Sequence, residues 1–207
     1  MRRNGGRLHK KGGVGTLKKL LNGKTIIFLG SSVTYGGGYS FVDALSEYDG
    51  VNTLKEAVNG TTLVTIVENS YIPRMKTISK DIVADAFVCQ LSTNDVWRDY
   101  PLSDIEKAII EIISYARQTW KCPVMFYTSP KTIGGRYADM VSLLLKIAED
   151  TGIYVLDMNN DSEMSDISPE KRAEYMNDSA HPNKKGYVEW WLPKFEEALE
   201  KVISSEQ

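Results

Sequence analysis

Histidine and cysteine, two side chains that often bind metal ions, are scarce in this sequence, which has two of each among 207 residues. Cys89 and Cys122 each lie inside a short apolar run, so we expect buried thiols rather than a disulfide. The histidines, His9 and His181, show no ligand spacing toward each other or toward the cysteines. No P-loop or Gly-x-Gly-x-x-Gly nucleotide motif is present either. The sequence therefore predicts no metal site and no cofactor.

Long apolar runs are also missing. No segment approaches the roughly 18 apolar residues of a membrane span, and the first thirty residues lack the apolar block and cleavage site of a signal peptide. We therefore expect no membrane contact and a cytoplasmic location, although a secreted protein trimmed of its signal would look the same. The composition, 42% hydrophobic and 25% charged, is that of one globular domain. The sequence gives no indication of the oligomeric state.

Acidic residues are absent from the first 24 positions, which hold eight Lys or Arg. The remainder holds 17 basic and 27 acidic residues, so a basic lead-in (1–24) precedes an acidic domain (25–207). A basic arm can bind nucleic acid, but the acidic domain would repel a phosphate backbone, and no basic helix or aromatic platform follows. We therefore expect a solvated lead-in and no nucleic-acid partner.

Apolar runs alternate with amphipathic patterns along the domain. Continuous apolar strands separated by helices predict a parallel α/β sheet covered on both faces. One helix is expected to begin at Ser103, with Glu106 completing a capping box, and the last is expected to kink at Pro193. The expected strands are 25–29, 84–91, 123–127 and 153–156, with a weaker one at 52–58, and the other expected helices are 39–48, 137–150 and 183–203.

Polar residues follow the ends of the expected strands, where parallel sheets place their sites. After the first strand the chain reads Gly30-Ser31-Ser32. Gly30 permits a sharp turn, and a serine there lies near unpaired N–H groups and the positive end of a helix dipole. Such a hydroxyl becomes nucleophilic only beside a base. Otherwise the serines cap or turn the chain, or they cradle a phosphate together with Gly36–Gly38 and Thr93.

His181 is the better placed of the two histidines to be that base. His9 lies in the basic lead-in, whereas His181 lies in a polar loop, with Asp178 three residues earlier and Pro182 placed to begin the last helix. One turn of chain can bring the Asp178 carboxylate to His181 Nδ1, which fixes the tautomer while Nε2 faces a hydroxyl. A helix cap beside a surface histidine would give the same pattern.

Two further positions suit the stabilisation of an oxyanion. Asn94 directly follows the most hydrophobic strand, and an amide there can donate to a developing negative charge. Its neighbour Asp95 is placed to orient that loop or to cap the segment after it. Gly60 has no side chain, so its N–H can approach a ligand closely, although glycine is also an ordinary turn residue.

Taken in chain order, these residues resemble the SGNH or GDSL hydrolases (esterases and lipases). The match comprises Gly30-Ser31-Ser32-Val33, Gly60, Thr93-Asn94-Asp95 and Asp178-x-x-His181-Pro182-Asn183, and it spans residues 25 to about 190. The resemblance implies a flavodoxin-like, three-layer α/β/α sandwich with five parallel strands. It also implies Ser32 as nucleophile, His181 as base and Asp178 as its orienter. The Ser32 N–H, the Gly60 N–H and the Asn94 side chain would form the oxyanion hole.

The substrate is less defined than the chemistry. Ser31, Val33 and Ser92 replace the Asp, Leu and Gly of the family pattern. Family members include carbohydrate acetylesterases, lysophospholipases, thioesterases and short-chain esterases. Because no long apolar lid is visible, we expect a small acyl group, carried by a small molecule or a carbohydrate, with acyl transfer to a sugar hydroxyl as an alternative. Tyr35 and Trp97 would stack on a sugar ring or simply pack.

Two other classes of protein remain as alternatives. An ordinary α/β-hydrolase requires Gly-x-Ser-x-Gly on a strained elbow, and the second glycine is missing around Ser32. A non-catalytic, flavodoxin-like module that binds a phosphate or nucleotide would use the same turn, but it leaves Asp178 and His181 without a role.

Overall fold

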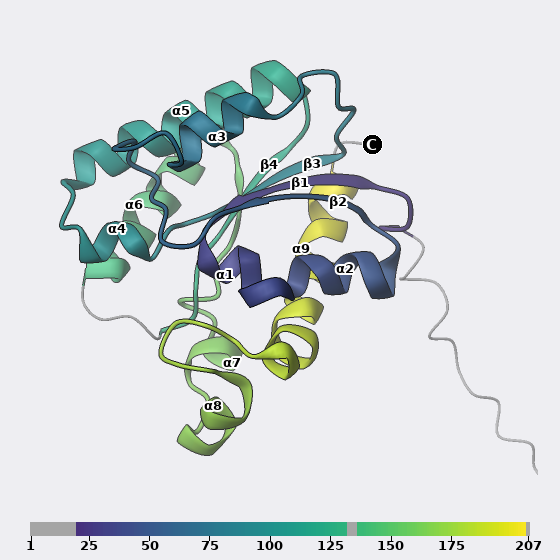
Figure 1. Cartoon of the computed structure of the whole chain (residues 1–207), viewed down its shortest axis with the longest axis vertical. Coiled ribbons are helices and arrows are strands. Elements are labelled where there is room, and N and C mark those ends of the chain that lie inside the picture. The colour runs from purple at the N-terminus through teal and green to yellow at the C-terminus, as the bar shows by residue number, and fades with distance from the viewer. Residues whose placement is uncertain (1–19, 132–135, 206–207) are drawn as a thin grey trace, which may run out of the picture.

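The computed structural model of the chain describes residues 20–131 and 136–205. Five parallel strands form one sheet in the order β2-β1-β3-β4-β5 (Figure 1). This is the flavodoxin-like order, in which the chain changes its direction of travel across the sheet between β1 and β3 and so creates a topological switch point. The predicted fold class is confirmed. The strands are β1 (Thr25–Gly30), β2 (Asn52–Ala57), β3 (Ala86–Gln90), β4 (Val124–Tyr127) and β5 (Tyr154–Leu156).

Helices cover both faces of this sheet and give the three layers seen in Figure 1. Alternate residues of β1 point to opposite faces, and both sets are fully buried, which explains why its apolar run is continuous. The first layer comprises α3 (Tyr71–Thr77), α5 (Leu102–Trp120) and α6 (Arg136–Thr151), and the second comprises α1 (Ser32–Tyr35), α2 (Phe41–Asp49) and α9 (Leu192–Ser204).

Five further short helical elements lie in the connections between the strands and helices named above. They are η2 (Gly36–Gly38), α4 (Asn94–Trp97), α7 (Ser162–Ser165), α8 (Pro169–Tyr175) and the π-helical turn η3 (Gly186–Trp191). The expected kink at Pro193 takes the form of η3, which directly precedes the proline in the first turn of α9. Proline cannot donate an N–H and its ring crowds the carbonyl four residues before it, so the wider turn accommodates it.

The start of α5 differs from the expectation. The helix begins at Leu102 with Pro101 as its N-cap, and no side chain caps it. Because Pro101 fixes φ at −56° with an extended ψ of 141°, the helix starts one residue before Ser103. Ser103 is therefore already inside the first turn, and the predicted capping box with Glu106 is wrong. A capping box does exist at α2, where Ser40 and Asp43 bond each other's backbone N–H groups.

The predicted basic lead-in lies mostly outside the described residues. Its last part, residues 20–24, belongs to the folded unit, because Leu21 is buried in the core and Lys24 forms an ion pair with Asp85. Cys89 and Cys122 are both buried, as their apolar surroundings predict. Within the described ranges, no helix is long and apolar enough to cross a bilayer.

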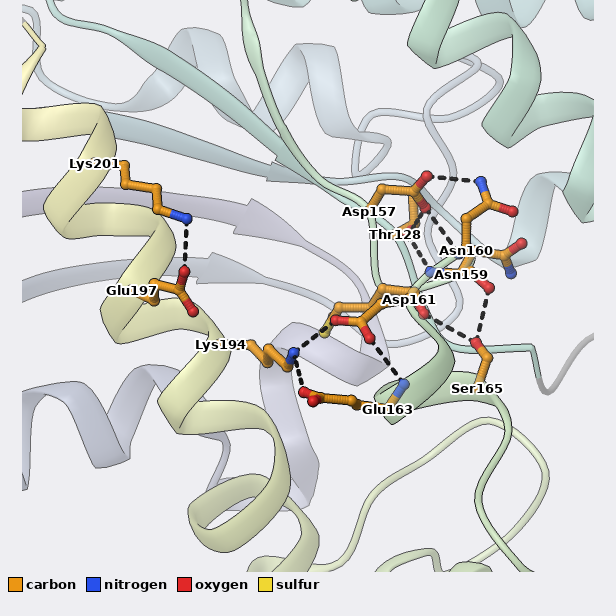
Figure 2. A network of polar contacts seen from close by, with 11 residues as sticks. Thr128, Asp157, Asn159, Asn160, Asp161, Glu163, Ser165, Lys194, Glu197 and Lys201 are labelled. Carbon is orange, nitrogen blue, oxygen red and sulfur yellow. Dashed lines mark hydrogen bonds and ion pairs between the residues drawn. The ribbon is translucent and has the colours of Figure 1, made fainter.

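A network of polar contacts fixes the segment that follows β5 and leads toward His181 (Figure 2). Asp161 caps α7 by accepting the Glu163 N–H at 2.9 Å, and its other carboxylate oxygen lies 2.7 Å from Lys194 Nζ of α9. Ser165 Oγ donates to the carbonyls after β5 and accepts the N–H of Lys131. The end of the sheet, α7 and α9 are thereby held together before the chain continues into α8.

This network predicts a pH dependence of stability. Partial burial raises the pKa of Asp161, but the hydrogen bonds from Lys194 and from the Glu163 N–H outweigh it and leave the pKa below its ordinary value. A carboxyl whose pKa is lower in the folded state stabilises the fold above its unfolded pKa of about 3.9, and this stabilisation is lost as pH falls further. We expect Asp161→Asn to lower Tm between pH 5 and 7, with the difference shrinking toward pH 3.

Thermal denaturation of both proteins across this pH range measures the effect. The exposed pair between Glu197 and Lys201, also drawn in Figure 2, supplies the control, because Glu197→Gln removes an ion pair whose carboxylate side chain is 62% exposed. Exposed pairs of this kind contribute little to stability, so its Tm should follow that of the wild type. A constant difference between Asp161→Asn and wild type from pH 3 to 7 would contradict the prediction.

Candidate active site

Ser32, His181 and Asp178 come from opposite ends of the chain and meet at the carboxyl edge of the sheet. The distance between His181 Nε2 and Ser32 Oγ is 2.8 Å. On the other side of the imidazole ring, Nδ1 lies 2.9 and 2.8 Å from the two carboxylate oxygens of Asp178. Because a carboxylate only accepts, Nδ1 carries the proton and Nε2 is the acceptor for the serine hydroxyl.

The backbone after β1 explains where Ser32 lies. A Cβ on Gly30 would sit 1.7 Å from Thr34 Oγ1, so only glycine fits at the end of this strand. The chain then turns at Ser31, which is fully buried, and Ser32 is the first residue of α1. The two adjacent serines therefore have different environments: Ser31 Oγ donates inward to Gln90, whereas Ser32 Oγ meets the histidine.

The loop that carries His181 is held by its own backbone. Met176 and Pro182 form an antiparallel bridge, and the Asn177 N–H donates to the His181 carbonyl at 2.8 Å. The expectation that Pro182 begins the last helix is wrong, because this proline closes the loop and helical geometry starts at residue 184. In Figure 1 this loop follows α8 and runs toward α1.

Asp178 is oriented by the same loop. Its Oδ1 accepts the N–H groups of Ala180 and His181, each at 2.8 Å. Partial burial raises the pKa of Asp178, but the hydrogen bonds from Ala180 and His181 outweigh this and lower the pKa below its usual value. The Asp178 carboxylate is therefore ionised at neutral pH, which suits a group that stabilises an imidazolium.

Asn94 and Gly60 lie on two loops that the structure ties together. Asn94 Nδ2 donates to the Thr61 carbonyl at 2.9 Å, next to Gly60, which adopts a positive φ of 73°. Asp95 is buried and accepts the N–H groups of Leu63 and Val64. Asp95 was expected either to orient the loop around Asn94 or to cap the segment after it. Its bonds to Leu63 and Val64 support the first role, because they tie the Asn94 loop to the loop that follows Gly60.

Arg74 connects these loops to the turn at Gly30 to Ser32, and sequence reasoning missed it. Its side chain is only 7% exposed, and Nη2 donates both to the Gly30 carbonyl at 2.8 Å and to Thr61 Oγ1 at 3.1 Å. A single arginine in a short amphipathic helix carries no sequence signal for such a role, because most arginines in that position face solvent.

An open cavity of about 280 Å³ lies beside Ser32 and His181. Tyr35 and Trp97, predicted as substrate contacts, do not line it: they end α1 and α4 and are 39% and 73% exposed. Sequence reasoning missed the two asparagines of the wall, since isolated surface amides carry no signal. Apart from Ser32, the lining residues are Gly36, Gly37, Asn59, Asn177, Asp178, His181, Pro182 and Tyr187.

The described ranges contain no group of three or more His, Cys, Asp or Glu side chains arranged to hold a metal ion.

A serine, a histidine and an aspartate hydrogen-bonded in this order, at the switch point of a parallel α/β sheet, is the arrangement found in serine hydrolases. The model of the GDSL-like lipase/acylhydrolase family matches residues 28–188. The chain belongs to this family, whose members hydrolyse esters.

Solved structures with similar folds are consistent with this assignment. A protein from Lactobacillus plantarum superposes with a TM-score of 0.72 at 21% identity, covering 89% of this chain and 98% of its own. The psychrotrophic esterase EstA from Pseudoalteromonas, in a structure inhibited by monoethylphosphonate, gives 0.68 at 22% identity, covering 87% and 99%. A GDSL-like lipase from Bacteroides thetaiotaomicron gives 0.60 at 16%, covering 89% of each chain. Among curated proteins, none matches the sequence.

Proposed function

We propose that the protein hydrolyses short-chain carboxylic esters, acetyl esters among them, through an acyl-enzyme on Ser32, and that carbohydrate esters are included in its substrates. The observation that carries this proposal is the 2.8 Å contact between Ser32 Oγ and His181 Nε2. A serine hydroxyl is a weak nucleophile alone and becomes an effective one when an oriented base can take its proton. The comparison with the phosphonate-inhibited esterase supports the same chemistry, because phosphonates react with nucleophilic serines.

Acylation begins when Ser32 Oγ attacks the ester carbonyl carbon and its proton passes to His181 Nε2. The carbonyl electron pair moves onto the oxygen, and Asp178 stabilises the imidazolium that has formed. The tetrahedral intermediate collapses, the bond to the alcohol oxygen breaks, and His181 gives its proton to the departing alcohol. Water then attacks the acyl-enzyme with His181 again as base, and the acid leaves as Ser32 recovers its proton.

The negative charge on the former carbonyl oxygen requires donors, and we assign these to the N–H groups of Ser32 and Gly60 and to Asn94 Nδ2. An amide nitrogen carries two hydrogens. One hydrogen of Asn94 Nδ2 bonds to the Thr61 carbonyl and fixes the plane of the amide. The other hydrogen is therefore available to a ligand. Preorganised donors of this kind are a major source of rate acceleration in acyl transfer.

The small volume of the cavity favours a small acyl group, and the amides in its wall favour a polar alcohol. Its wall includes two glycines and two asparagines, and His181 and Asp178 are 37% and 55% exposed at its rim. Pro182 and Tyr187 give the cavity some apolar surface, but at about 280 Å³ it is too small to cover a long fatty chain. The two amides suit the hydroxyl groups of a sugar. Lysophospholipids, thioesters and acyl transfer to a sugar hydroxyl are the alternatives that a substrate panel must include.

The decisive experiment measures kcat/KM for p-nitrophenyl esters with acyl chains of two to sixteen carbons, alongside acetylated sugars, acyl-CoA thioesters and a lysophospholipid. We expect the highest values at two to four carbons, and release of acetate from at least one acetylated sugar. A maximum at ten or more carbons would refute the short-chain proposal, and inactivity on every acetylated sugar would refute the carbohydrate part. Product analysis with excess free sugar detects transfer.

The binding-module alternative finds little support in the site. It requires the Ser31 hydroxyl to face a phosphate, but this hydroxyl is buried and donates to Gln90. If no ester is cleaved while a nucleotide raises Tm in proportion to its concentration, the module is favoured.

A further inference from the structure

We propose that Gln90 is a positioning residue, whose buried side-chain oxygen fixes the turn that presents Ser32 to His181. This inference rests on the proposed function. Gln90 ends β3 and is fully buried. Its Oε1 accepts the Ser31 N–H at 3.0 Å, the Ser31 hydroxyl at 3.3 Å and the Thr34 hydroxyl at 2.8 Å. These donors lie on both sides of Ser32 in the chain.

The helix that Ser32 begins needs an external anchor. α1 is four residues long, and a single helical turn is not stable by itself. No side chain caps its N-terminus, because the Ser31 hydroxyl, at the N-cap position, donates to Gln90 instead. Thr34, in the middle of α1, makes the second contact. The Gln90 oxygen therefore holds the helix by its first turn as a substitute for a cap.

A second anchor connects α1 to the segment after the histidine. The Tyr187 hydroxyl, from η3, donates to the Val33 carbonyl at 2.8 Å. Tyr187 keeps α1 near the His181 loop, while Gln90 fixes the orientation of α1 relative to the sheet. Thr34 Oγ1 also contacts the Tyr127 hydroxyl of β4 at 2.7 Å, which holds the C-terminal part of α1. Without the Gln90 oxygen, the Ser31 end of α1 loses its anchor, and Ser32 Oγ leaves its place beside His181. Displacements of about 1 Å are enough to lower the rate of a positioned reaction strongly.

Stability alone does not account for a glutamine here. The orientation of its amide is determined, because the Ser31 N–H can only donate and must therefore face the oxygen. Nε2 is then left buried and without a hydrogen-bond partner among the described residues. A buried, unpaired donor destabilises a fold. The other four residues of β3 are apolar and fully buried, so an apolar side chain would suit this position better if packing were its only role.

The test compares Gln90→Met, which keeps the volume but loses the acceptor, with Gln90→Glu, which keeps an acceptor oxygen. For Gln90→Met we expect kcat on p-nitrophenyl acetate to fall by about 10- to 100-fold, with KM within about threefold of wild type. Gln90→Glu should retain kcat within about threefold. The matched control is Val88→Ala, two residues earlier on the same strand face, which should lower Tm comparably and leave kcat unchanged.

A fluorophosphonate probe reports the reactivity of Ser32 directly. Ser32 Oγ forms a bond to phosphorus, fluoride leaves, and the serine proton passes to the base. The labelling rate of Gln90→Met should fall by the same factor as kcat. If Gln90→Met does not fold, Thr34→Val decides, because it removes one of the three donors to Gln90. It also removes the contact to the Tyr127 hydroxyl, so Tyr127→Phe, which loses only that contact, is its control. We expect a lower kcat with unchanged KM in Thr34→Val and an unchanged kcat in Tyr127→Phe.

Two results would overturn the inference. The first is full kcat in Gln90→Met, or full kcat in Thr34→Val if Gln90→Met does not fold. The second is an equal loss of kcat in Gln90→Met and in Val88→Ala. The assay also includes Ser32→Ala, so that the two proposals fail separately. Activity that survives in Ser32→Ala refutes the serine mechanism itself. An inactive Ser32→Ala beside a fully active Gln90→Met refutes only the role of Gln90.

Discussion

Replacing Ser32 with alanine is expected to lower kcat/KM for p-nitrophenyl acetate by about four orders of magnitude, while Tm stays within a few degrees of wild type. The substitution removes the only atom that can form the acyl-enzyme. Among the described residues, the Ser32 side chain bonds only to His181, and the turn itself is held by Ser31 and Thr34. Initial rates and thermal denaturation of the same preparations measure both quantities.

The two histidines provide a matched pair of further variants. His181→Ala should lose about as much activity as Ser32→Ala, because the serine then has no base, and the double variant should lose no more than either. His9→Ala, which changes the other histidine, should retain full activity. Full activity in either Ser32→Ala or His181→Ala would remove that residue from its role.

The second large effect is expected at Asn94. Asn94→Ala should lower kcat by about 10²- to 10³-fold, equivalent to about 3–4 kcal/mol of transition-state stabilisation, with a smaller change in KM. The reason is that, in the proposed oxyanion hole, the amide donates to an oxygen that becomes negative only during the reaction. Steady-state kinetics on p-nitrophenyl acetate and on the best acetylated sugar measure the change.

Ser92→Ala separates catalysis from loop geometry at this site. Both Ser92 Oγ and Asn94 Nδ2 approach the Thr61 carbonyl, at 3.4 and 2.9 Å. If Asn94 acts on the substrate, Ser92→Ala should lower kcat by less than about tenfold. An equal loss in both variants would instead mean that Asn94 serves to hold the loop around Thr61.

The fold and the converging residues were predictable because their signals are local. β1 and β3 are continuous apolar runs that any parallel sheet requires, and all five expected strands lie within two residues of the observed bounds. Asp178 and His181 are three residues apart, so a single loop brings them together. Among Ser32, Asp178 and His181, it is the contact between Ser32 and His181 that joins distant parts of the sequence, and its prediction relied on the resemblance to a family.

The parts that sequence reasoning missed depend on which side chains meet across the fold. Gln90 lies beside the turn that carries Ser32 because β1 and β3 pair with Leu29 opposite Cys89, and a single sequence does not reveal this register. Arg74 lies between two loops because α3 packs under the end of β1. The start of α5 was misplaced by one residue, since the backbone preference of Pro101 outweighed the capping tendency of Ser103.

The separation of Ser32 and His181 by 149 positions in the sequence has a consequence for biosynthesis. A ribosome exposes the first strand and its serine long before it has made the loop that contains the imidazole. In the proposed mechanism, a chain that ends between Ser32 and Asp178 carries a serine hydroxyl without its base. Ester cleavage would then begin only after the last part of the domain has folded and brought the imidazole to the serine.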